Sequence, residues 1–309
     1  MAEAFMQRYG QSSNGMRIAY SREKTPMRTG GAIKYAEELI GHEEPFLVLN
    51  GDIFTKIDYT TLLKRHNEYG AVATIALIQV EDPSRYGTVK LTKDSRVTQF
   101  VEKAPRGQAP SNLINAGVYV LEPEIFDYIP GGRPVSIEHE VFPKLAKEGK
   151  LFGHEFRDVW VDIGKPADYL RANRVLLNAG LKNRVLGKDD SIEEKVEFNE
   201  PVMVAVGVKV RQNSRIGPYV VIGKDVALGS NVLLEDSVVF SGVTISDNAS
   251  VRGSVIGEGT VIGKGAKIME GCVIGDYVTV QDNVTVSRDV TICHSKTVTE
   301  NVPESTRIT

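Results

Sequence analysis

The stretch VIGEGTVIGKGAKI, residues 255–268, decides the architecture of the C-terminal part of the chain. Isoleucine stands at every sixth position in it, at Ile256, Ile262 and Ile268. The same period extends in both directions over apolar residues, namely Ile216, Ile222, Leu228, Leu234, Phe240, Ile245, Val251, Ile274, Val280 and Val286. The spacing slips to five residues before Ile245 and again before Ile256.

A period of six matches neither the 3.6-residue repeat of an α-helix nor the simple alternation of separate strands. It predicts a parallel β-helix with three short strands per coil of about 18 residues, whose aliphatic side chains fill a narrow interior. Glycine and asparagine at the corners would permit the tight bends. Residues 216–290 would form about four coils, with a possible entry coil at 202–210. A β-sandwich with regular turns is disfavoured, because its strands do not keep such a register.

The composition changes near residue 196 and indicates two domains. Residues 1–195 hold 18 of the 22 aromatic residues, and the remainder of the chain is rich in valine and isoleucine. A length of 309 residues also fits two domains at about 150 residues each. We therefore predict an α/β domain over 1–180, a charged linker over 181–195, the β-helix over 196–290, and a polar tail or cap over 291–309.

Strand and helix signals alternate in the first part, as in a layered α/β domain. The segment Phe46–Leu49 is continuously apolar, which predicts a strand buried on both faces of a parallel sheet. Further strands are expected at 16–20, 71–80, 89–91, 97–102, 116–121 and 159–163. Helices are expected at 32–40, 59–69, 138–147 and 167–179.

Composition and charge exclude several classes of function. The chain has 37 basic and 40 acidic residues, and a net charge of −3 does not favour nucleic acid or an anionic membrane as partner. Two cysteines, Cys272 and Cys293, cannot build a disulfide framework or a zinc site. The first ten residues, MAEAFMQRYG, lack the apolar core of a signal peptide, and no apolar run reaches about 18 residues. A cytoplasmic location is the expectation.

Two acidic residues stand in or directly after apolar strands. Asp52 follows Phe46–Leu49, and ligands of open α/β sheets bind at such strand ends. Asp162 lies within the apolar run 159–163, where a buried acid must be paired or metal-bound. Each could hold a hard cation such as Mg²⁺. The alternatives without a metal are that Asp52 caps a turn and that Asp162 faces outward on an edge strand.

Other polar motifs are weak when taken singly. Strand alternation would direct Glu102 and Lys103 to opposite faces, and a surface ion pair explains them without a function. The segments Ser84–Gly87 and Asn112–Tyr119 place polar residues at junctions of loops and strands, which ordinary turn chemistry also explains.

In combination these motifs resemble one family. The order T-G-G-A (29–32), L-N-G-D (49–52), P-S-R-Y-G (83–87), F-V-E-K (100–103), N-A-G-V-Y (115–119) and W-V-D-I-G-K-P (160–166) is similar to that of the sugar-1-phosphate nucleotidyltransferases, or NDP-sugar pyrophosphorylases. Within that family the chain most resembles the mannose-1-phosphate guanylyltransferase type, through Ser136-Ile137-Glu138 and Phe142-Pro143-Lys144. The resemblance covers about residues 10–180. It implies a Rossmann-like, GT-A-like domain followed by a left-handed β-helix of hexapeptide repeats.

The resemblance also implies the reaction. An oxygen of a sugar 1-phosphate attacks the α-phosphorus of a nucleoside triphosphate in line, and pyrophosphate leaves. Asp52 and Asp162 would hold Mg²⁺ between the phosphates, and Lys103 would contact the sugar phosphate. GTP with mannose 1-phosphate is the expected substrate pair, which would give GDP-mannose, and glucose 1-phosphate with dTTP or UTP stays open.

The remaining roles that the resemblance implies concern the sugar and the base. Glu102 and Asn115 would bind sugar hydroxyls, with Gly87 behind the sugar. Thr29 and Gly30 would lie near the nucleotide base.

The chain departs from the family pattern at its start. The family opens with a strand and a glycine-rich triphosphate loop, and this sequence begins about 70 residues into that pattern. An N-terminally truncated domain of an active enzyme, a chain with a misplaced start, and a short non-catalytic partner of a full-length paralogue all stay open. A hexapeptide acyltransferase is disfavoured, because His294 is the only histidine after residue 196 and lies past the regular repeats. Stacked coils favour a homo-oligomer.

Overall fold

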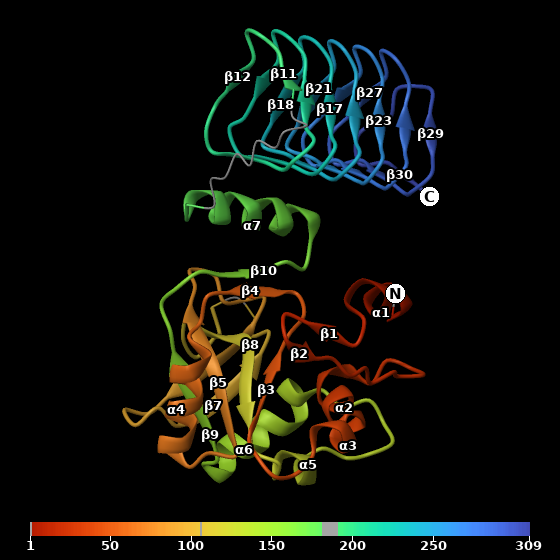
Figure 1. The fold of residues 1–309 in the computed structure, drawn as a ribbon. Helices are drawn as coiled ribbons and strands as arrows, with labels where there is room; N and C mark the ends of the chain where they lie inside the picture. Colours follow the sequence, from red (N-terminus) through yellow and green to blue (C-terminus); the bar gives the residue numbers. More distant parts are fainter. Residues whose placement is uncertain (1, 106, 181–190) are drawn as a thin grey trace. The chain divides into compact units, whose positions relative to one another are not determined.

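The computed structural model of the chain describes residues 2–105, 107–180 and 191–309 (Figure 1). It divides into two compact units, Met1–Trp160 and Val161–Thr309. Residues 181–190 of the predicted linker lie outside the described residues. Among those described, no helix is both long and apolar enough to cross a bilayer.

A mixed six-stranded sheet forms the centre of the N-terminal unit (Figure 1). Its strands are β3 (Phe46–Leu49), β5 (Ala73–Gln79), β6 (Gly87–Leu91), β7 (Val97–Glu102), β8 (Leu113–Leu121) and β9 (Leu151–Glu155). The order is β7-β6-β8-β5-β9, and β3 also pairs with β8. Strand β8 runs antiparallel to β3, β5 and β6, whereas β5 and β9 are parallel. The long strand β8 therefore lies at the centre of the sheet and pairs with β3, β5 and β6.

Strand β3 differs from its prediction as a strand buried on both faces. It pairs with β8 alone, in antiparallel orientation, among the strands described. Its side chains alternate in burial, and Leu47 and Leu49 are 41% and 50% exposed. Phe46 and Val48 pack toward the core instead. A continuous apolar run cannot distinguish a central strand from one covered on a single face.

Helices cover both faces of this sheet. The unit contains α1 (Ala2–Tyr9), α2 (Arg28–Tyr35), α3 (Glu37–Ile40), α4 (Tyr59–Tyr69), α5 (Ile125–Tyr128), the π-helical turn η1 (Ile137–Val141) and α6 (Phe142–Glu148). Short strands β1 (Ser12–Ser13) and β2 (Met16–Arg17) form a hairpin, and β4 (Ile53–Thr55) follows β3. One core cluster joins α2, α5, η1 and α6 to the sheet, and a second joins α4 to the opposite face.

Local sequence explains both ends of helix α4. Asp58 accepts a hydrogen bond from the Thr60 N–H and caps α4, and Gly70 ends that helix with a left-handed φ of 58°. The predicted helix over 32–40 is interrupted, because Ala36 leaves helical geometry between α2 and α3. The predicted helix over 138–147 begins instead as a π-helical turn, with Ser136 at its cap.

The C-terminal unit begins with the last residues of β10 (Trp160–Asp162), followed by α7 (Pro166–Asn178) and a parallel β-solenoid (Figure 1). The first sheet stacks β11 (Ser191–Ile192), β14 (Lys209–Val210), β17 (Ala227–Leu228), β20 (Thr244–Ile245), β23 (Val261–Ile262), β26 (Thr279–Val280) and β29 (Thr297–Val298). The second stacks β12 (Glu197–Phe198), β15 (Arg215–Ile216), β18 (Leu233–Glu235), β21 (Ser250–Arg252), β24 (Lys267–Ile268) and β27 (Thr285–Val286).

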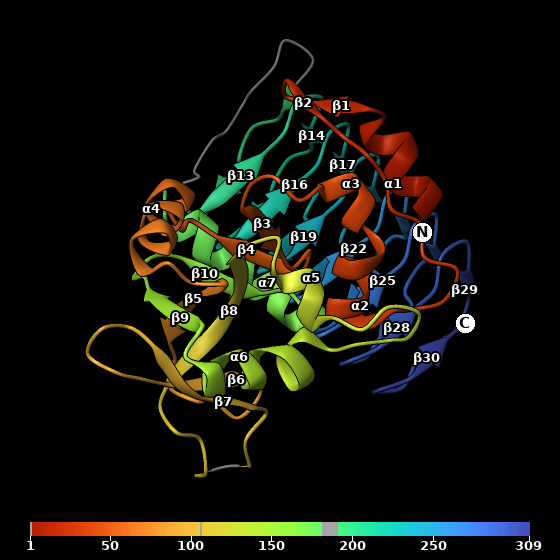
Figure 2. The same ribbon diagram turned by 90° about the horizontal axis from the view of Figure 1, so that it is seen from below.

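The strands of the third sheet are labelled one after another in Figure 2. This sheet stacks β13 (Val202–Val204), β16 (Val220–Ile222), β19 (Val238–Val239), β22 (Val255–Ile256), β25 (Val273–Ile274), β28 (Thr291–Ile292) and β30 (Arg307–Ile308). The parallel β-helix and its coil length are confirmed, since Val202 pairs with Val220 one coil later. The left-handed sense stays a prediction.

The solenoid extends past both predicted limits. It begins at Ser191, within the segment predicted as a linker, because β11 pairs with β14. It continues through the predicted tail, where β28 and β30 add to the third sheet and β29 adds to the first. The six-residue period of aliphatic or aromatic residues continues over these coils, so the sequence already contained their signal, at Ile192, Phe198, Val204, Val210, Ile292 and Val298.

One inward position was assigned wrongly. Phe240 is 40% exposed, whereas the preceding Val239 is buried and pairs with Ile222 and Ile256 in neighbouring coils. The first five-residue spacing therefore lies between Leu234 and Val239. Both five-residue spacings thus end at strands of the same sheet, β19 and β22.

Some corner glycines have a role other than the expected one. Gly223, Gly257 and Gly263 do not adopt a positive φ. A Cβ at Gly257 or Gly263 would instead lie 2.6 Å from a backbone nitrogen of the next coil, at Asp276 or Asp282. Glycine is required there for the close approach of stacked backbones, whereas the expected left-handed corner conformation is adopted by other glycines, such as Gly259, and by asparagines, such as Asn283.

Candidate functional site

Gly87 and Glu102 lie opposite each other where β6 meets β7. A Cβ at Gly87 would lie 2.5 Å from Oε2 of Glu102 and 2.8 Å from the ring of Phe100. Glycine therefore leaves room for the Glu102 side chain to lie over β6. Burial raises the pKa of Glu102, the charge of Glu138 raises it further, and the nearby Lys103 and His139 oppose the shift. The structure thus brings together two residues that the sequence assigned to the sugar.

Asn115 belongs to a polar group at an irregularity in the pairing of strand β8 with β5. Its Nδ2 donates to the hydroxyl of Tyr119 at 2.9 Å, and its Oδ1 accepts from the Gly117 N–H at 3.0 Å. Gly117 has a φ of 72°, and the pairing of β8 with β5 shifts register beside it. A Cβ at Gly117 would lie 2.9 Å from Nδ2 of Asn50. Burial raises the pKa of Tyr119, which keeps its hydroxyl protonated.

Thr29 and Gly30 open helix α2 and contact the segment before η1. The Thr29 hydroxyl donates to Oε2 of Glu138 at 2.6 Å and accepts from the Ile137 N–H at 3.1 Å. The Gly30 N–H donates to the Val135 carbonyl at 2.9 Å, and a Cβ at Gly30 would lie 3.1 Å from the Ile137 nitrogen. Both residues therefore fix the start of α2 against residues 135–138. A role beside the nucleotide base stays a prediction.

Lys103 does not continue the alternation of β7. Strand β7 ends at Glu102, and Lys103 takes a left-handed φ of 49°. Its N–H donates to the Tyr86 carbonyl at 3.1 Å, and its side chain is exposed. The expectation that Glu102 and Lys103 point to opposite faces assumed regular strand geometry, and the turn at Lys103 removes that constraint.

The two candidate metal ligands lie in different units. Asp52 is exposed in the turn between β3 and β4, two residues after Asn50, whose N–H donates to the Gly117 carbonyl at 2.9 Å. Asp162 ends β10 in the C-terminal unit. Trp160, two residues earlier, donates its indole N–H to the Ala116 carbonyl at 2.9 Å. Within the part of the chain that is described, no group of three or more His, Cys, Asp or Glu side chains forms a ready-made metal site.

The sequence reasoning missed Glu138, Tyr119 and Asn50 as members of this cluster. Ser136-Ile137-Glu138 contributed to the family resemblance without receiving a role. The position of Glu138 next to a serine that caps η1 was the available signal. Tyr119 lies four residues after Asn115 on the same strand, so the bulge in β8 brings their side chains together, whereas Asn50 reaches Gly117 only through the pairing of β3 with β8.

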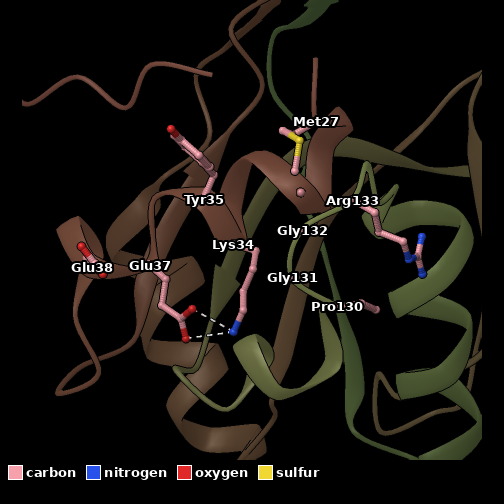
Figure 3. A pocket seen from close by; sticks show the side chains of 10 residues that line it. Met27, Lys34, Tyr35, Glu37, Glu38, Pro130, Gly131, Gly132 and Arg133 are labelled. Atoms are coloured by element: carbon pink, nitrogen blue, oxygen red, sulfur yellow. Dashed lines mark hydrogen bonds and ion pairs between the residues drawn. The ribbon is translucent and has the colours of Figure 1, made fainter. Parts of the chain in front are cut away.

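Two cavities lie in the N-terminal unit near these elements. One, of about 460 Å³, is lined by Glu81 to Ser84 after β5 and by loop residues after β7 that include Pro105 and Asn112. The other, of about 270 Å³, lies between α2 and the loop from Pro130 to Arg133 (Figure 3). Lys34 points toward Glu37 there and forms an ion pair of 2.8 Å with it. None of the predicted site residues lines this second cavity.

Comparison with known proteins covers both units. The family profile described as "Nucleotidyl transferase" matches residues 2–179, and the "GMPPB C-terminal domain" profile matches residues 198–308. The chain is 42% identical over 158 residues to the mannose-1-phosphate guanylyltransferase catalytic subunit beta of Danio rerio, a match that covers 50% of this chain and 43% of the relative. It is 35% identical over 208 residues to the protein of the same name from Dictyostelium discoideum, which covers 67% and 51%.

A crystal structure described as a glucose-1-phosphate thymidylyltransferase from Bacillus anthracis has the same fold. It superposes with a TM-score of 0.51 at 21% identity, over 56% of this chain and 71% of that one. The chain spans about half the length of the curated relatives it matches. Because the nucleotidyl transferase profile matches more than half of its residues, the chain belongs to the nucleotidyl transferase family.

Proposed function

We propose that this chain provides the sugar-binding part of an enzyme that transfers a guanylyl group from GTP to mannose 1-phosphate, forming GDP-mannose and pyrophosphate. The observation that supports this most directly is the cluster of Gly87, Glu102, Asn115 and Tyr119. The names of the relatives supply the nucleotide and the sugar.

The cluster has the chemistry that a sugar ring requires. The carboxylate of Glu102 accepts hydrogen bonds from hydroxyl groups, and the absence of a side chain at Gly87 leaves room for that carboxylate to lie over β6. The Asn115 amide is held by Tyr119 and by the Gly117 N–H, so its orientation is set before the sugar arrives. We assign Glu102 and Asn115 to the sugar hydroxyls, and Gly87 to the surface behind the ring.

The phosphates need charge neutralisation and alignment rather than a protein nucleophile, because sugar phosphate and triphosphate repel each other. Lys103 is the first residue of the loop after β7, directly after Glu102, and its side chain is exposed. A sugar bound to Glu102 would thus carry its phosphate within reach of this cation. We assign Lys103 to that phosphate, and Thr29 and Gly30 to the region of the nucleotide base.

Asp52 and Asp162 fit a divalent cation by the chemistry of their oxygen donors, since Mg²⁺ is commonly held by one or two carboxylates together with substrate phosphates. Among the described residues, Asp52 forms no side-chain hydrogen bond or ion pair, so its carboxylate is available to an ion. When bound, Mg²⁺ would neutralise charge on the α-phosphate and the sugar phosphate. We propose these two carboxylates as its protein ligands.

A screen for pyrophosphate release tests the proposed function. GTP, dTTP and UTP are each combined with mannose 1-phosphate and glucose 1-phosphate, on the 309-residue chain and on a longer chain that carries a glycine-rich segment before Met1. We expect the longer chain to release pyrophosphate, with GTP and mannose 1-phosphate as the preferred pair. Asp52→Asn and Asp162→Asn should each lower that rate by at least about 100-fold.

The outcomes of this screen separate the alternatives. Preference for glucose 1-phosphate with dTTP or UTP would replace the substrate assignment. Failure of both chains with every pair, while the 309-residue chain stimulates a full-length relative, would instead indicate a non-catalytic partner.

We also propose that the protein is cytoplasmic and forms a homo-oligomer. Light scattering that shows a monomer would contradict the proposed homo-oligomer.

A further inference from the structure

Glu138 is a carboxylate held at one oxygen only. Its Oε2 accepts a hydrogen bond from Thr29 Oγ1 at 2.6 Å and another from Ser136 Oγ at 2.7 Å. Within the described part of the chain, neither a hydrogen bond nor an ion pair uses its other oxygen, Oε1. The side chain is half-buried. A carboxylate fixed in this way keeps one oriented acceptor free for a ligand.

The fold places Glu138 next to the sugar-binding cluster. Four residues after it, the ring of Phe142 packs against Phe100 of β7 and Tyr119 of β8, with ring centres 5.5 and 5.1 Å apart. Phe100 is the residue that adjoins Gly87, and Tyr119 holds the Asn115 amide. The start of α6 therefore rests on the two strands that carry the cluster, and the turn η1 directly before it packs against α2 and β7.

The electrostatics agree with this placement. The charge of Glu138 raises the pKa of Glu102, and it contributes to the raised pKa of Tyr119. Two carboxylates thus lie in one region of the N-terminal unit, near the neutral hydroxyl of the buried Tyr119. Such a group accepts hydrogen bonds from adjacent sugar hydroxyls and repels a second negative charge on the sugar.

We propose that Glu138 is a specificity-determining residue of the sugar site, whose Oε1 accepts a hydrogen bond from a sugar hydroxyl. Thr29 and Ser136 act as positioning residues, because their hydroxyls fix the other oxygen. The start of α2, which the sequence assigned to the nucleotide, is thereby linked to sugar recognition. This inference rests on the proposed binding of a sugar 1-phosphate near Glu102.

Equilibrium binding of mannose 1-phosphate to the 309-residue chain tests the inference without requiring turnover. A hydrogen bond to a charged acceptor corresponds to a loss of about 10- to 100-fold in affinity when it is removed. We expect that loss in Glu138→Gln, and less than a twofold change in Glu148→Gln. Glu148 is a matched control, because it is an exposed carboxylate at the end of α6 that bonds the hydroxyl of Tyr128.

Two further measurements distinguish a direct role from a structural one. Thr29→Ser keeps the hydroxyl and should bind mannose 1-phosphate more tightly than Thr29→Val. Carbon NMR titration of the Glu102 carboxyl should show a lower pKa in Glu138→Gln than in the unchanged chain, and no change in Glu148→Gln. If Glu138→Gln does not fold, the two Thr29 variants carry the binding test.

The result for the unchanged chain separates this inference from the proposed function. If the unchanged chain binds mannose 1-phosphate and Glu138→Gln binds it equally well, the inference is overturned and the proposed function stands. If the unchanged chain binds neither mannose 1-phosphate nor glucose 1-phosphate, the proposed function and the inference are both overturned. Tighter binding of a uronic acid 1-phosphate than of mannose 1-phosphate would also contradict the inference, because two carboxylates repel such a sugar.

Discussion

Gly87 lies so close to the end of the Glu102 side chain that a Cβ at Gly87 would be 2.5 Å from Oε2 of Glu102. Replacement Gly87→Ala must therefore displace Glu102, Phe100 or both. We expect weaker binding of mannose 1-phosphate and a loss of about 1–3 kcal/mol in the free energy of unfolding, as for other overpacked sites. Urea denaturation and equilibrium binding measure the two effects.

A control for this substitution is Gly131→Ala, because a Cβ at Gly131 would meet no atom within 4 Å and its φ is not left-handed. Its unfolding free energy should stay within about 0.5 kcal/mol of the unchanged chain. Equal stability and equal sugar binding in Gly87→Ala would show that the Glu102 side chain does not depend on the missing Cβ.

The interior of the solenoid offers a test of its packing. Ile262 is fully buried, whereas the neighbouring Val261 on the same strand is 39% exposed. We expect Ile262→Ala to lower the free energy of unfolding by about 2–5 kcal/mol, since it leaves a cavity in the stack of aliphatic side chains. Val261→Ala should cost less than about 1 kcal/mol. Urea denaturation followed by circular dichroism provides the values, and similar losses for both variants would contradict the inward assignment of Ile262.

The two cysteines should differ in reactivity. Cys272 is buried in the solenoid and its Sγ contacts the Ser287 carbonyl at 3.0 Å, whereas Cys293 is partly exposed. Burial raises the pKa of the Cys272 thiol, so little thiolate forms at pH 8. A disulfide reagent should modify one thiol per folded chain and two in urea. The variant Cys293→Ser should show almost no reaction when folded, and rapid reaction of that variant would refute the prediction.

His66 should make the stability of the N-terminal unit depend on pH. The ring is buried, with Nδ1 2.8 Å from Thr74 Oγ1 and Nε2 3.1 Å from Oε1 of Glu122. Burial lowers the pKa of His66 below 6.5, and Glu122 opposes this shift without cancelling it. The unfolded chain therefore takes up a proton at a higher pH than the folded chain does.

The sign follows from this difference. The contribution of neutral His66 is complete above pH 6.5 and is lost as the pH falls toward the lowered pKa of the folded state. Urea denaturation at pH 7.5, 6.5 and 5.5 should show a smaller decrease for His66→Gln than for the unchanged chain. His154→Gln corrects for a second half-buried histidine whose pKa is also lowered by burial. An identical pH dependence with and without His66 would contradict the assignment.

The sequence by itself determined the solenoid and its coil length. Each coil repeats the same burial requirement, so a six-residue pattern of Ile and Val is visible without any knowledge of distant contacts. The same period continues back to Ile192 and marks the first strand of the array, but it does not mark the last strand, Arg307–Ile308, whose isoleucine lies ten residues after Val298. The local order of motifs likewise sufficed to indicate the family, and it predicts Glu102 and Asn115 as sugar-binding residues.

Only the tertiary structure decided how those motifs combine. Phe46–Leu49 has the composition of a central strand, yet pairing with β8 alone leaves Leu47 and Leu49 exposed. Thr29 and Glu138 are 109 residues apart in the chain, and the packing of η1 against α2 brings their side chains into hydrogen-bond contact. Local patterns record which face of an element is apolar, whereas the meeting of polar groups from separate elements depends on how sheet and helices pack, and no short stretch of sequence contains that information.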